Sequence, residues 1–299
     1  MRRLIAPLTA LLLLTTGCAP ARTGTLGPAP AGASRSAGAT PPGTGPGTPA
    51  TVPPATPSAS AATTDPSSAE EPSRDGTITL QLWFARGGRL VPARRTLPAT
   101  LATSRLALTE LAAGPSVAET ATGMTTLVPP GAQVSRIAGG VATLAPPAGF
   151  DGGGAANARL RRAQVVWTLT QFPTVRRVAF SANDTAPSGR DDYADLLPPI
   201  VVTAPAIGDR VTSPVTVTGT ADVFEATVSV RVLDAAGREV GTAFTVARCG
   251  SGCRGDYRVR VGYRLDRAGP GTIEVYEVSA RDGSRINVVT VPVVMTAGG

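Results

Sequence analysis

From residue 76 onwards, apolar and polar residues alternate in short runs, which is typical of half-buried β-strands. In the first run, Thr77–Phe84, the apolar residues Ile78, Leu80 and Leu82 stand at every second position and so share one face, which predicts a strand. After a Gly87–Gly88 turn comes a weaker run, Leu90–Leu97. Pro92 favours an edge position for this second strand, because proline cannot donate to a strand ladder.

Two longer segments have the helical period. Ser104–Pro115 begins with a capping-type serine, repeats leucine and alanine on one face, and ends at Gly-Pro, which predicts a short helix. Ala155–Phe172 contains a β-prone stretch, but its length and period favour a helix. We expect three arginines of this helix to form a solvated face and Trp167 to be a core aromatic residue. These arginines are Arg159, Arg161 and Arg162.

Between these helices, Val134–Ile137 and Val141–Leu144 flank Gly139–Gly140 and predict a hairpin. After the second helix, Val175–Phe180 predicts a last strand. With the weaker run Leu90–Leu97 set aside as an edge, the order of strand, helix, two strands, helix and strand indicates an α+β domain over residues 76–186. We expect a split β-α-β arrangement with both helices on one face of a small sheet.

A different pattern follows a linker over residues 187–198. Seven short alternating runs, separated by turns, predict an all-β sandwich of the immunoglobulin type over residues 199–296. The runs are Ile200–Thr203, Val215–Thr220, Thr227–Leu233, Glu239–Ala247, Asp256–Tyr263, Thr272–Ala280 and Ile286–Val294.

The amino terminus has the pattern of an export signal over residues 1–17. Arg2 and Arg3 precede an apolar run, Leu4–Leu14, which is too short to remain as a membrane-spanning helix. The small residues before Cys18 resemble the lipobox of bacterial lipoproteins, and this resemblance implies diacylation of the Cys18 thiol and anchoring in the membrane. The alternative is an ordinary secreted protein that is cleaved near this point.

Residues 18–75 consist almost entirely of Ala, Pro, Gly, Ser and Thr. Such a segment cannot bury enough apolar surface to offset the entropy of ordering, so we expect a disordered tether. Its length gives a root-mean-square reach of roughly 40 Å.

Cys249 and Cys253 are the other two of the three cysteines and lie four residues apart. Disulfides persist after export, and the intervening glycines allow a tight ring, so we expect a local disulfide. Two reduced thiols in a flexible loop are the alternative.

Composition argues against catalysis. The chain has no histidine and a net charge of +7 that is carried by scattered arginines. Histidine is the commonest general base and metal ligand, so we expect no enzyme, metal site or cofactor. Three carboxylates, Asp191, Asp192 and Asp195, lie in the linker, where we expect nothing to hold them at a catalytic separation. We expect no nucleic-acid partner.

Five stretches occur in order in the first domain: Leu82–Pro92, Leu111–Pro115, Leu127–Gly131, Gln164–Pro173 and Val175–Val178. Together they resemble a GerMN domain. This resemblance implies an extracytoplasmic module related to ring-building domains, without a recognised active site. In the second domain, Pro205, Asp209–Pro214, Val217–Ala226 and Val278–Ser284 resemble the immunoglobulin-like domain that accompanies GerMN in germination-type proteins.

We therefore expect a non-enzymatic lipoprotein on the extracytoplasmic face of the cell membrane, of the sporulation and germination type, which serves as an assembly or binding scaffold. Envelope proteins, or further copies of the chain, are the expected partners. The alternative is a module that binds wall polysaccharide through exposed aromatic residues, but most of the aromatic residues available lie at strand positions where we expect burial. They are Phe224, Phe244, Tyr257, Tyr263 and Tyr276. We expect Glu225 to cap a turn or the backbone.

Overall fold

The computed structural model describes residues 76–298, which belong to one compact unit. The predicted signal peptide, the lipid site at Cys18 and the tether lie outside the described residues. None of the helices in residues 76–298 is long and apolar enough to cross a membrane.

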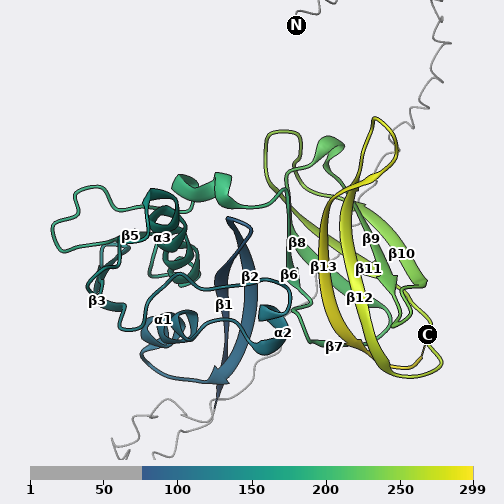
Figure 1. Ribbon diagram of the computed structural model, residues 1–299, viewed down its shortest axis with the longest axis horizontal. Helices are drawn as coiled ribbons and strands as arrows, with labels where there is room; N and C mark the ends of the chain where they lie inside the picture. The colour runs from purple at the N-terminus through teal and green to yellow at the C-terminus, as the bar shows by residue number, and fades with distance from the viewer. Residues whose placement is uncertain (1–75, 299) are drawn as a thin grey trace, which may run out of the picture. The chain divides into compact units, whose positions relative to one another are not determined.

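The first domain contains five strands and three helices, seen in blue and teal in Figure 1. In chain order they are β1 (Thr77–Arg86), β2 (Arg89–Pro98), α1 (Thr103–Ala113), α2 (Val117–Thr120), β3 (Gln133–Ala138), β4 (Val141–Ala145), α3 (Ala155–Leu169) and β5 (Arg177–Ala179).

These strands form two sheets, not the one small sheet that we expected. β1 and β2 make an antiparallel hairpin, while β3, β4 and β5 make a separate sheet in that order. β3 and β4 are antiparallel around Gly139–Gly140, as predicted. β4 and β5 pair in parallel, and α3 connects them along the chain. A single bridge between Ala85 and Thr125 is the other strand-like contact of the β1 edge.

The reason for the split is that side chains of α3 and of Gln171, which follows it, occupy the free edge of β1. The Gln171 amide accepts from the Gln81 N–H and donates to the Gln81 carbonyl, both at 2.9 Å. The Thr168 hydroxyl accepts from the Trp83 N–H at 3.1 Å, and the Gln164 amide donates to the Trp83 carbonyl at 3.0 Å. Because these groups satisfy the β1 backbone, no third strand can pair there.

The apolar core lies between the β1–β2 hairpin and helices α1 and α3. β1 is buried on both faces, with Leu80, Leu82 and Phe84 on one and Trp83 on the other. Trp167 packs against Trp83 at 4.7 Å between ring centroids, which agrees with the core position that we expected.

Arg161 is buried, so the expectation of a solvated arginine face was wrong at this position. It is 9% exposed, and its guanidinium donates to the carbonyls of Leu127 at 2.7 Å, Gly152 at 3.0 Å and Phe150. The surrounding loops thus provide acceptors for the charge, which helical period alone could not reveal.

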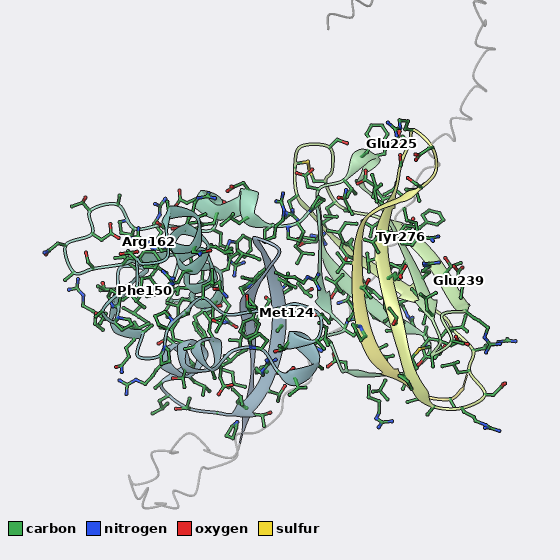
Figure 2. The ribbon with its side chains drawn as sticks, viewed as in Figure 1. Met124, Phe150, Arg162, Glu225, Glu239 and Tyr276 are labelled. Carbon is green, nitrogen blue, oxygen red and sulfur yellow. A yellow bond between two sulfur atoms is a disulfide. The ribbon has the colours of Figure 1, made fainter. Side chains whose placement is uncertain are left out.

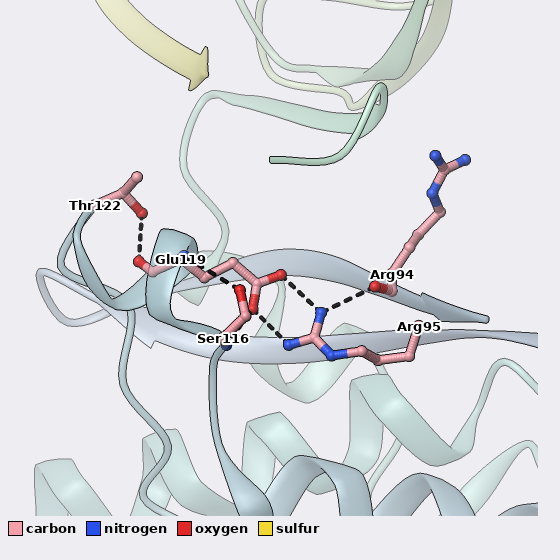
Figure 3. Close-up of polar contacts among 5 residues, drawn as sticks. All are labelled: Arg94, Arg95, Ser116, Glu119 and Thr122. Atoms are coloured by element: carbon pink, nitrogen blue, oxygen red, sulfur yellow. Dashed lines mark hydrogen bonds and ion pairs between the residues drawn. The ribbon is translucent and has the colours of Figure 1, made fainter. Parts of the chain in front are cut away.

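An ion pair between a partly exposed arginine and a buried carboxylate fixes the segment after α1. Arg95 on β2 donates to both carboxylate oxygens of Glu119, at 2.7 and 2.5 Å, and to the Arg94 carbonyl (Figure 3). Glu119 also accepts from the Ser116 N–H at 2.8 Å, while the Ser116 hydroxyl accepts from the Glu119 N–H. This reciprocal pair is a capping box for α2.

The expected linker, residues 187–198, is a packed segment. It contains the 3-10 helix η1 (Asp191–Leu196), and it buries Tyr193 and Leu197 in the core of the first domain. Arg89, at the start of β2, donates to the carbonyls of Asp195 and Leu197 at 2.9 and 3.1 Å. These contacts attach the segment to the first domain.

The second domain is a sandwich of two sheets, with strand orders β10-β9-β12-β13-β7 and β11-β8-β6 (Figure 1). All seven predicted strands are present, together with the two-residue strand β7, which was not predicted. The strands are β6 (Ile200–Ala204), β7 (Arg210–Val211), β8 (Val215–Ala221), β9 (Thr227–Leu233), β10 (Glu239–Val246), β11 (Gly255–Val261), β12 (Gly269–Val278) and β13 (Arg285–Met295).

Candidate binding surface

The two cysteines of the second domain form a disulfide at one end of the sandwich. Cys249 and Cys253 lie in the loop between β10 and β11, with their Cα atoms 5.6 Å apart. The intervening Ser251 donates its N–H to the Val223 carbonyl at 3.0 Å, and its hydroxyl accepts from the Glu225 N–H at 3.1 Å. These two hydrogen bonds hold the disulfide loop against the β8–β9 connection, which contains Phe224–Ala226 (η2).

Three residues at this tip have left-handed backbones without being glycine. The φ angles of Glu225, Ala226 and Ser251 are 53°, 56° and 57°. Such conformations carry strain and persist where neighbouring contacts hold them. The buried carboxylate of Glu277 supplies one such contact, because it accepts from the Phe224 N–H at 3.0 Å. The tip is thus a fixed structure with Phe224, 55% exposed, on its surface.

Glu225 does not cap the backbone as we expected. Within residues 76–298 its carboxylate accepts no hydrogen bond, and Figure 2 shows the residue at the outer end of the sandwich. Its own main chain is held instead, through the Ser251 hydroxyl.

Apolar side chains continue from this tip along the outer face of the five-stranded sheet. The register places Phe244 of β10 and Tyr276 of β12 on either side of Ser229 in β9. Val246 lies in the next row, opposite Thr227, and Val278 follows Tyr276 on the same face of β12. Phe244 is 73% and Val246 62% exposed. We call Phe244, Val246, Tyr276 and Val278 the apolar face.

The other half of the same sheet surface is polar. Arg231 of β9 binds Glu274 of β12 at 2.7 Å and approaches Glu239 of β10 at 4.0 Å. Figure 2 labels Tyr276 and Glu239 on this side of the sandwich. The apolar face is therefore bounded by charges at one end and by the disulfide tip at the other.

Two of the three carboxylates considered for catalysis, Asp192 and Asp195, have structural partners, whereas Asp191 is exposed. Asp195 binds the Arg159 guanidinium at 2.7 and 2.8 Å, and this pairing holds the pKa of Asp195 below its usual value. Asp192 accepts from the Gly189 N–H at 2.7 Å. In the part of the chain that the structure describes, no three Cys, Asp or Glu side chains are grouped closely enough to hold a metal ion.

Family models match both domains. Residues 81–187 match the family described as "Sporulation and spore germination", and residues 199–284 match the "Immunoglobulin-like domain of bacterial spore germination". The chain carries a GerMN domain followed by the germination-type immunoglobulin-like domain. The resemblance of the two folded domains, stated from the sequence, is thereby confirmed.

Solved structures with similarity to the chain include the tandem GerMN domains of the sporulation protein GerM from Bacillus subtilis. That match has 16% identity and a TM-score of 0.33, and it covers 62% of this chain and 62% of the other. The first GerMN domain of the same protein matches with 25% identity and a TM-score of 0.30, over 36% of this chain and 84% of the other. These TM-scores are low, so the assignment depends on the family models. Comparison with curated proteins finds no match.

The apolar face of the immunoglobulin-like domain was not predicted from the sequence. Tyr257 and Tyr263 are buried, as we expected for strand aromatics, but Phe224 and Phe244 are exposed. The alternation Thr242, Phe244, Val246 did indicate that these side chains share one face of β10. It could not indicate which face is covered by the second sheet.

Proposed function

We propose that this protein is a non-enzymatic lipoprotein anchored at the extracytoplasmic face of the membrane through Cys18, and that it binds another envelope protein through the apolar face of its immunoglobulin-like domain. The observation that supports this proposal is the exposure of Phe244 and Val246 beside Tyr276 and Val278 on a rigid sheet. Contiguous apolar side chains on a soluble domain commonly mark interaction sites.

The chemistry of the apolar face favours a protein partner over wall polysaccharide. Sugars are bound by flat, accessible aromatic rings together with polar groups, whereas two of the four residues here are valines. The Tyr276 ring is covered in part by the Arg285 guanidinium, 5.7 Å from its centroid. Aromatic and aliphatic side chains bounded by charges are typical of the core and rim of a protein interface.

A photo-crosslinking experiment tests the binding surface. A photoreactive phenylalanine analogue replaces Phe244 in the full chain, and a second version carries it at Arg258, an exposed position of the other sheet. After irradiation of intact cells, we expect a protein adduct from position 244 that is absent from position 258. Adducts of the same identity and yield from both positions, or none from 244, would overturn the proposal.

Two further measurements separate the anchor and the alternative ligand. Cys18→Ala should move the protein from the membrane fraction to the soluble fraction, and finding the wild-type protein without lipid would refute the anchor. Isolated wall material should not retain the full chain. Retention that is lost in Phe244→Ser would instead favour the polysaccharide-binding alternative.

A further inference from the structure

A cavity of about 360 Å³ lies beside the edges of β6 and β13 and the turn of the β1–β2 hairpin. Val91, Met124, Ile207 and Val289 supply much of its apolar lining, and Arg86 and Arg89 lie at its polar side. It is separate from the apolar face, since none of the four residues of that face lines it. Pockets of this volume are large enough to hold a ligand.

The β6 strand presents unpaired main-chain groups on the side away from β8. The carbonyl of Pro199 accepts from the Asp222 N–H at 2.9 Å, and that of Val201 accepts from the Tyr257 hydroxyl at 3.2 Å, so both point toward β8. Main-chain groups alternate in direction along a strand, so those of Ile200 and Val202 point the other way. Within residues 76–298 neither residue bonds to the main chain of another segment on that side.

The β13 strand is open in the same manner over its middle part. The short strand β7 pairs with β13 only at Val294 and Met295, and the Pro292 carbonyl accepts from the Gly208 N–H at 2.8 Å. Thr290 has the same orientation as Pro292, so its N–H and carbonyl point away from β12, where no described main-chain group bonds to them. Val202 and Thr290 both line the cavity.

The charge at the cavity has one sign, because its lining contains two arginines and no carboxylate. The Arg89 guanidinium already donates hydrogen bonds to the carbonyls of Asp195 and Leu197. Arg86 has no hydrogen bond or ion pair within the described part of the chain, and partial burial lowers the pKa of its guanidinium. A desolvated arginine of this kind is suited to a carboxylate, which it can bind through two parallel hydrogen bonds.

We propose that this cavity binds a short extended peptide of a partner protein, which pairs with the free edge of β6 or β13 and places a carboxylate against Arg86. An extended peptide satisfies unpaired strand edges, as in recognition by β-strand addition. Its apolar side chains would contact Val91 and Met124, which a simple anion would leave uncovered. The inference is independent of the proposed function, since it uses neither the lipid anchor nor the apolar face.

The test uses two pentapeptide libraries with randomised flanks, one with a central Asp and one with a central Asn, applied to the immobilised full chain. We expect the Asp library to be enriched at least tenfold over the Asn library. Arg86→Gln should abolish this difference, Arg86→Lys should retain part of it, and Arg105→Gln, an exposed charge on α1, should leave it unchanged. Unfolding temperatures of the variants show that the fold is intact.

Hydrogen exchange on the most enriched peptide tests the mode of binding. Strand addition predicts slower exchange of the amides of Val202 or Thr290, with no change at the apolar face. Equal enrichment of both libraries, enrichment that survives Arg86→Gln, or binding that protects neither edge would overturn the proposal. Competition by acetate as strong as competition by the peptide would show an anion site only, which also overturns it.

Discussion

The free edges of β1 and β6 differ in how their main-chain groups are satisfied. At the β1 edge, Gln164 and Thr168 of helix α3 and Gln171, which follows the helix, bond to the strand and close it. At the β6 edge, Val202 lines the cavity, and no described segment pairs with its main chain on the side away from β8. Both strands belong to one chain, yet the β6 edge is left open beside a cavity, whereas the β1 edge is closed.

The comparison shows that helix side chains can take the place of a neighbouring strand. Exposed strand edges promote unwanted pairing, so proteins usually cover or charge them. The GerMN domain covers β1 with amide and hydroxyl groups. An edge that remains open next to a cavity and an unpaired arginine is therefore a place where a partner can bind, and the following substitutions test this contrast.

The largest effect is expected from Gln164→Leu, which removes the cover of β1. Gln164 is fully buried and bonds to the Trp83 carbonyl and, at 2.9 Å, to the Leu127 N–H. Its loss leaves the buried Trp83 carbonyl and the partly buried Leu127 N–H unsatisfied and should lower the free energy of unfolding by about 4 kcal/mol. Urea unfolding measures this. Gln133→Leu, at an exposed position of β3, is the matched control and should change little; equal effects would contradict the comparison.

Glu119→Ala should destabilise the GerMN domain by about 3 kcal/mol. It leaves the Arg95 guanidinium without its partner and removes the capping box of α2. Chemical denaturation at neutral pH provides the measurement. Arg162→Ala breaks a pair with Asp151 that is exposed on both sides, and should cost less than about 1 kcal/mol.

The same carboxylate predicts a pH dependence. Burial by itself raises the pKa of Glu119, but the bonds from Arg95 and Ser116 outweigh it, so the pKa lies below its ordinary value. The folded state thus favours the ionised form. The stabilisation is complete above the unfolded pKa of about 4.3 and is lost as the pH falls through the lower folded value. Glu119→Gln should flatten this part of the stability profile between neutral pH and pH 3; an unchanged slope would count against the ion pair.

Removal of the disulfide should have an intermediate effect. Replacing Cys249 and Cys253 by alanine opens a very short loop, for which chain entropy predicts a loss of about 2 kcal/mol. Thermal unfolding with and without reductant checks this, since the wild type under reductant should approach the variant. Equal stability of the oxidised wild type and the variant would show that the tip is fixed by its hydrogen bonds alone.

The smallest effect on stability, and the largest on binding, is expected from Phe244→Ser. Because Phe244 is exposed, the free energy of unfolding should change by no more than about 0.5 kcal/mol. Co-purification of the envelope partner should nevertheless be lost. A stability loss of the size seen for Gln164→Leu would show that Phe244 is a packing residue and would remove the support for an interaction surface.

Local signals in the sequence determined the order and type of the elements. The Gly139–Gly140 turn, the helical period of α3 and the alternation of the sandwich strands are each set by neighbouring residues, and the structure contains them all. The spacing of Cys249 and Cys253 likewise placed both thiols in one loop, where the structure joins them.

Only the tertiary structure decided which groups those elements cover. The buried Arg161, the cover of β1 by Gln164, and the exposure of Phe244 depend on segments far away in the chain. Sequence period identifies the side chains that share a face, because it follows from backbone geometry alone. Whether that face meets protein or water depends on which distant segment packs there, and this is a property of the assembled fold.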